Sequence, residues 1–106
     1  MVLTRDFRLT VVARVQRDSK FHGTLLAEVV NACLAGDTRT GKAVLRELVN
    51  ATGGFEGLTA EVKKPSKSFH RMLAPHGDPS AEILFDIVRA LQRNARVRLR
   101  VTAELA

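Results

Sequence analysis

The segment from Phe55 to Leu73 reads FEGLTAEVKKPSKSFHRML. Apolar residues at helical spacing occur on both sides of its single proline: Leu58, Val62, Phe69 and Met72. Pro65 interrupts a helix interior but fits the first turn of a helix, where its missing N–H costs nothing. The pattern therefore predicts two short helices that meet at a turn and lock at a steep angle through their apolar faces.

The outward-facing positions of the second helix hold short or basic hydrogen-bonding residues: Ser66, Lys67, Ser68, His70 and Arg71. No Asp or Glu occurs from Val62 to Gly77, whereas a merely solvated helix face usually mixes acids with bases. Hydroxyl and cationic groups of this kind reach the base edges and phosphates of DNA. The residues favour DNA binding over the alternative, which is that two short helices simply pack together.

Four more helices follow from apolar spacing and from capping residues. The first spans Asp6 to Val15, the second starts at the N-cap Asp18 and stops at Gly36, and the third starts at Asp37 and stops before Gly53. The last starts at Ser80 and carries its apolar set through Leu91. We predict that the core contains Val12, Leu25, Val29, Leu45, Leu48, Leu58, Val62, Phe69, Ile83, Ile87 and Leu91.

The chain ends in a segment with a different period. Arg96 to Thr102 alternates basic or polar with apolar residues, which is typical of a strand with an arginine face. A lone strand needs a partner, so we expect it to pair with the same strand of a second copy about a two-fold axis. The alternative is a basic tail. The fold class expected is all-α, one compact domain over residues 1–106 with N-terminal helices in 1–52, a helix-turn-helix region in 53–93 and a dimerisation strand or tail in 94–106.

Composition limits the function. The 106 residues are 45% hydrophobic and 26% charged, which suits one globular domain. No apolar run is long enough for a membrane span, and we expect a cytoplasmic protein. The single cysteine, Cys33, has no partner for a disulfide, and the three histidines have no Cys or carboxylate at the spacing of a metal or catalytic site. We therefore expect no cofactor, no metal and no enzyme activity. A net charge of +6 without Tyr or Trp favours duplex DNA over single strands.

At this point the sequence resembles a known family. The stretch from Phe55 to Gln92 is similar to the helix-turn-helix of lambda-repressor/Cro-like regulators, and especially to their antitoxin branch, the addiction-module antidote proteins. These antitoxins follow the recognition helix with a Leu-Ser-Pro-x-Gly-Asn-Pro-like loop, which here reads LAPHGDP from Leu73 to Pro79. Lys63 stands where the family turn usually has glycine, and Thr59 where its first helix usually has alanine. A non-glycine residue predicts either a strained or a rearranged turn.

The resemblance implies a type II toxin–antitoxin antitoxin that binds its own operator and a small ribonuclease toxin. It assigns base contacts to the first, second and sixth positions of the recognition helix, here Ser66, Lys67 and Arg71. We expect phosphate contacts from Lys63, Lys64, Ser68 and His70. The expected partners are double-stranded DNA, the toxin and a second copy of the chain. Two alternatives stay open: a free-standing transcriptional repressor and an interaction module that does not bind DNA.

Overall fold

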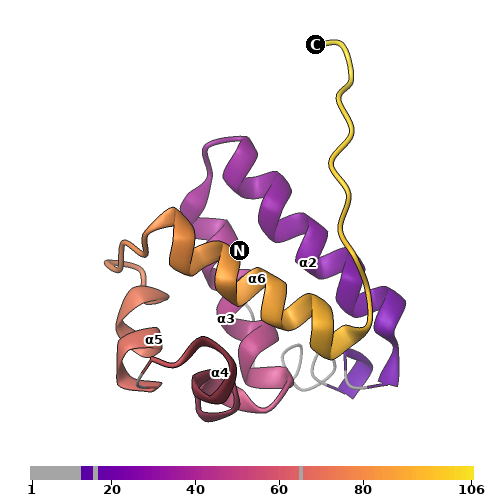
Figure 1. The fold of residues 1–106 in the computed structure, drawn as a ribbon. Coiled ribbons are helices and arrows are strands. Elements are labelled where there is room, and N and C mark those ends of the chain that lie inside the picture. Colours follow the sequence, from indigo (N-terminus) through magenta and orange to yellow (C-terminus); the bar gives the residue numbers. More distant parts are fainter. Residues whose placement is uncertain (1–12, 16, 65) are drawn as a thin grey trace.

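The computed structural model describes residues 13–15, 17–64 and 66–106, and within them every regular element is a helix (Figure 1). Residues 13–15 and 17 are helical and precede five bounded helices. These are α2 (Ser19–Leu34), α3 (Thr38–Ala51), α4 (Gly54–Val62), α5 (Ser66–Met72) and α6 (Ala81–Ala95). The expected all-helical class is confirmed, although most of the expected first helix, Asp6 to Val15, lies outside the described residues.

Three helices begin at the capping residues expected from the sequence. The Asp18 carboxylate accepts a hydrogen bond from the Phe21 N–H at 3.1 Å, and the Ser80 hydroxyl accepts from Ile83 N–H at 3.2 Å. Asp37 accepts from Thr40 N–H at 3.2 Å. Hydrogen bonding to Thr40 also holds the pKa of Asp37 below its ordinary value. Each cap satisfies a backbone donor that the first helical turn leaves without a partner.

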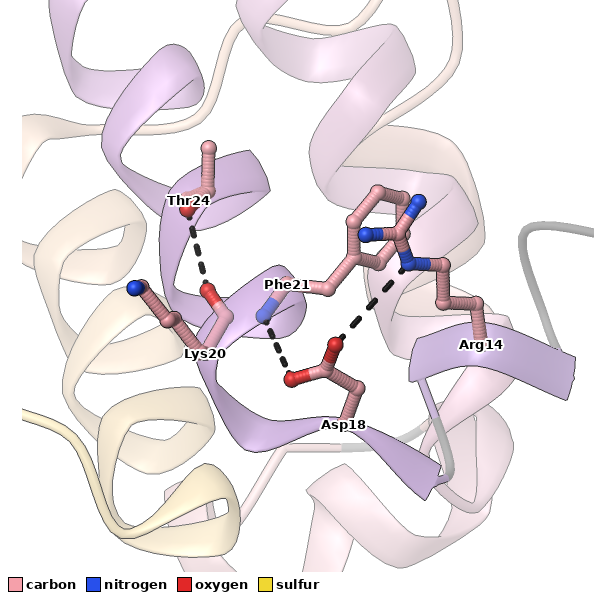
Figure 2. Close-up of polar contacts among 5 residues, drawn as sticks. All are labelled: Arg14, Asp18, Lys20, Phe21 and Thr24. Atoms are coloured by element: carbon pink, nitrogen blue, oxygen red, sulfur yellow. Dashed lines mark hydrogen bonds and ion pairs between the residues drawn. The ribbon is translucent and has the colours of Figure 1, made fainter.

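Figure 2 shows that the start of α2 carries further polar and cation–aromatic contacts. The Arg14 guanidinium lies 3.9 Å from the Asp18 carboxylate and 4.2 Å from the centroid of the Phe21 ring. One turn later the Thr24 hydroxyl donates to the Lys20 carbonyl at 3.0 Å. The Arg14 contacts connect the helical residues before Asp18 to the first turn of α2.

One core lies between the helices. α2 packs against α3 and α6, while α4 packs against α3, α5 and α6. Seven predicted core residues are buried: Val29, Leu45, Leu48, Leu58, Phe69, Ile87 and Leu91. Three more, Leu25, Val62 and Ile83, are half-buried against this core, and Val12 lies outside the described residues. Leu26, which the prediction omitted, is fully buried because the centre of the apolar stripe on α2 falls between its two rows of apolar residues.

The C-terminal segment keeps the alternation expected of it without forming a ladder in the described part of the chain. α6 ends at Ala95, and its C-cap residue Arg96 takes a left-handed conformation with φ 58°. Beyond it Val97 and Leu99 are half-buried, whereas Arg98 and Arg100 are exposed. The Leu99 N–H donates to the Gln92 side-chain oxygen at 2.7 Å, which holds the segment against α6. Pairing of this segment with a second copy stays a prediction.

A buried histidine makes stability depend on pH. His22 is 2% exposed and its Nε2 atom has no hydrogen-bond partner, so burial lowers the pKa of this side chain. The neutral form favours the folded state, and stability should fall as pH drops through about 6.5, the ordinary pKa, toward the lowered one. Urea unfolding between about pH 7.5 and 5 should show this loss.

His22→Leu should be more stable than the natural protein by about 1 kcal/mol, because it removes an unsatisfied buried group. It should also lack the decline near pH 6.5. His76→Gln alters an exposed histidine and should keep that decline. An unchanged pH profile for His22→Leu would show that His22 does not titrate with folding.

Candidate nucleic-acid interface

Lys63 has a strained backbone conformation where α4 gives way to the turn before α5. It is the residue that caps the C-terminal end of α4, and it lies in the left-handed region with φ 59° and ψ 43°. Its N–H still donates to the Thr59 carbonyl at 2.8 Å. Residue 65 lies outside the described residues, and α5 begins at Ser66. Lys63 therefore has a conformation that a glycine would adopt freely, and a lysine adopts it at a cost.

If this surface binds DNA, replacing Lys63 with glycine should change stability and DNA affinity in opposite directions. Relief of the left-handed backbone should stabilise the fold by about 0.5 to 1 kcal/mol, after allowing for the greater freedom of glycine in the unfolded chain. Loss of one cation should weaken binding to every duplex alike and reduce the salt slope by about one unit. Urea unfolding and duplex binding across salt concentrations measure the two effects.

Lys64→Gly is the matched control, because Lys64 is not among the residues with positive φ. It should lose the same amount of DNA affinity without any gain in stability. Equal stability changes in the two variants would contradict the strain assigned to Lys63.

The inner side of this helix pair contacts the core. Leu58 on α4 and Phe69 on α5 are buried, and Leu73 just after α5 is 1% exposed. Val62 and Met72 are half-buried against the same cluster. These apolar contacts fix α5 relative to α4 at one end of the molecule (Figure 1). Only the opposite side of α5 is left to meet a ligand.

The outer side carries the residues that the sequence predicted. Five of the seven are exposed: Lys63, Lys64, Lys67, His70 and Arg71. Ser68 is half-buried, and the side chain of Ser66 lies outside the described residues. His70 and Arg71 occupy the last turn of α5, where positive charge interacts favourably with the C-terminal end of a helix. The fold therefore gathers five exposed basic side chains around one turn and one short helix.

The loop after α5 folds back onto the end of that helix. A Cβ atom on Gly77 would overlap the carbonyl oxygens of Arg71 and Met72, so only glycine allows this approach. The Gly77 N–H donates to the Ala74 carbonyl at 2.8 Å. From α3, Lys42 Nζ donates to the Pro75 and Gly77 carbonyls at 3.3 and 2.5 Å. The loop thus couples α5 to α3 across more than 30 residues of sequence.

A basic hollow that the sequence analysis missed lies beside this loop. Its lining contains the basic residues Arg39, Lys42, Arg46 and His76 and no acidic residue. The three α3 residues follow one another at spacings of three and four, which places them on one helix face. The sequence therefore contained enough to predict a basic face on α3. The proximity of α3 to residues 75–77, however, arises only in the tertiary structure.

The described residues contain no group of three His, Cys, Asp or Glu side chains placed to hold a metal ion. None of the described helices is long and apolar enough to cross a membrane. Comparisons with protein-family models, with curated proteins and with solved structures give no match.

Proposed function

We propose that this chain is a sequence-specific DNA-binding transcriptional regulator that places α5 in the major groove of double-stranded DNA. The observation that carries the proposal is the pair α4 and α5, joined at a left-handed turn and locked by Leu58 and Phe69. Its outer side is exposed, basic and free of acidic residues from Val62 to Gly77. A short helix that projects cations and hydroxyls can enter the major groove, which is wide enough for a helix.

The proposed roles divide by position on the helix pair. Ser66, Lys67 and Arg71 read base edges. Lys63, Lys64, Ser68 and His70 contact phosphates on either side. The α3 residues Arg39 and Arg46, with His76, extend the positive surface beside α5, where it attracts the adjoining phosphate backbone.

A unique operator needs more contacts than one short helix provides, so we propose a homodimer on two half-sites. The C-terminal segment supplies the means of association. Half-sites read by a two-fold dimer lie about 34 to 36 Å apart, one turn of DNA, or a multiple of this distance.

We further propose that the regulator is the antitoxin of a cytoplasmic type II toxin–antitoxin module that represses its own operon. The support is the resemblance carried by the loop from Leu73 to Pro79, in which Gly77 occupies a position that no other residue fits. A small ribonuclease toxin would then bind folded surface. Co-purification with the product of a neighbouring small reading frame tests this part, and its absence favours the free-standing repressor.

Binding of the natural protein to random duplex DNA across a salt series tests the DNA-binding proposal. The logarithm of the affinity should fall linearly with the logarithm of the salt concentration, because cations on α5 and α3 displace counterions from the phosphates. A Lys67→Glu variant should bind more weakly with a shallower slope, whereas Lys20→Glu on α2, outside this surface, should leave binding nearly unchanged. Lack of retention on duplex DNA at low salt favours the interaction module instead.

A further inference from the structure

An apolar groove lies between the second half of α2 and the first half of α6. Its lining side chains come from both helices: Val30, Cys33, Leu34, Leu84, Phe85 and Val88. Leu34 at the end of α2 is 69% exposed, and Phe85 on α6 is 58% exposed. Large apolar side chains gathered on one surface in this way are typical of an interaction site. The groove lies apart from the basic surface of α5 and is not used by the proposed DNA contacts.

The C-terminal segment carries apolar residues that the chain itself leaves uncovered. Its odd-numbered positions are all apolar, and its even-numbered positions from Arg96 to Glu104 are all polar or charged. The first two odd positions are satisfied, since Val97 lies beside Gly23 and Leu99 packs against the core. Val101 and Leu105 are 73% and 102% exposed, and Figure 1 shows the segment leaving the helical body.

The groove and the segment adjoin each other. Val30 and Leu34 line both the groove and a second hollow. The segment bounds that second hollow with Leu99, Arg100, Val101, Thr102 and Glu104. One copy of the chain therefore presents both an unfilled apolar groove and two exposed apolar side chains, Val101 and Leu105, that the chain itself does not cover. If two copies exchange segments about a two-fold axis, the groove and the exposed side chains cover each other, as surfaces do in a self-complementary interface.

We propose that the groove receives the C-terminal segment of a second copy, with Val101 and Leu105 of each copy packed against Leu34 and Phe85 of the other. This exchange also avoids a cost of direct pairing between two C-terminal strands. In such a ladder Arg96, Arg98 and Arg100 would lie opposite their own symmetry mates, which is unfavourable for like charges. In the exchanged arrangement the even-numbered side chains point away from the apolar contact.

The test compares the oligomeric state of the full-length natural protein with that of segment and groove variants by analytical ultracentrifugation without DNA. Val101→Asp, Leu105→Asp and Phe85→Asp should each raise the dimer dissociation constant by more than about tenfold. Thr102→Asp is the matched control, because it adds the same charge one residue away on the opposite face, and it should leave the constant nearly unchanged. Thermal unfolding checks that each variant folds, and Leu34→Asp is a second groove variant.

Mixing two defective variants identifies exchange. A heterodimer of the two variants has one unaltered contact between segment and groove. The Phe85→Asp chain supplies its natural segment, and the Val101→Asp chain supplies its natural groove. Dimers should therefore reappear in the mixture. A monomeric natural protein, groove variants that stay dimeric, or a mixture that stays monomeric would each overturn the proposal. The inference supplies the second copy that operator binding needs, yet its failure leaves duplex binding, which is measured separately, untouched.

Discussion

Replacing Arg71 with alanine is expected to weaken binding to a selected operator by about 1 to 3 kcal/mol and to relax sequence preference at one position of each half-site. Arg71 is exposed in the last turn of α5, and its two-pronged guanidinium matches the two acceptors of a guanine edge. Titration of the variant against selected and random duplexes at fixed salt measures both effects.

Lys64→Ala is the control for a residue that contacts only the backbone. It should weaken selected and random duplexes equally and lower the salt slope by about one unit. If Arg71→Ala shows that same uniform loss, Arg71 contacts phosphate and the base-reading role belongs to other residues of α5.

The largest effect on stability is expected at Gly77. The Cβ of an alanine there would overlap the carbonyl oxygens of Arg71 and Met72. These are backbone atoms, which cannot move aside as the end of a flexible side chain can. We expect a loss of about 3 kcal/mol, at the upper end of the usual cost of overpacking, measured by urea unfolding. Operator binding should also fall, because the end of α5 must shift to relieve the clash.

Gly57→Ala is the matched control. Gly57 lies within α4, and a Cβ there would meet no atom within 4 Å. The change should stabilise the protein by about 0.5 to 1 kcal/mol, since alanine favours the helix over glycine. Unaltered stability of Gly77→Ala would show that residues 73–79 do not fold back against α5.

Local features of this fold were readable from the sequence because they depend on neighbouring residues. Asp18, Asp37 and Ser80 cap helices through bonds to N–H groups three residues later, so their positions follow from composition alone. The buried side of the α4 and α5 pair was also predictable, because the helical spacing of Leu58 with Val62 and of Phe69 with Met72 defines it.

Features that depend on tertiary packing were not readable. His22 lies four residues before Leu26 and seven before Val29, so it shares their buried face, but a polar residue in that stripe was not counted as core. The basic hollow was missed because Lys42 and the loop at Gly77 meet across 35 residues of sequence. Lys63 left two outcomes open, since only the backbone decides between a strained turn and a rearranged one.

The exposed C-terminal residues illustrate the same limit. The alternation from Arg96 to Thr102 predicted a strand with an arginine face, or else a basic tail, and the same alternation continues to Leu105. The sequence does not indicate which apolar residues of this segment pack against the chain's own helices and which stay exposed. In the structure Leu99 is half-buried and Val101 is exposed, as is Leu34 beside the groove.

Methylation interference at guanine N7, on a duplex selected from a random pool, shows whether α5 reads DNA from the major groove. N7 lies on the major-groove edge, so its methylation should block binding wherever α5 contacts a guanine. We expect interference in two clusters about 34 to 36 Å apart or a multiple of this distance, with one position lost from each cluster in Arg71→Ala. A selected duplex on which N7 methylation has no effect at any guanine, or a pool that yields no preferred sequence, would show that α5 does not read bases in the major groove.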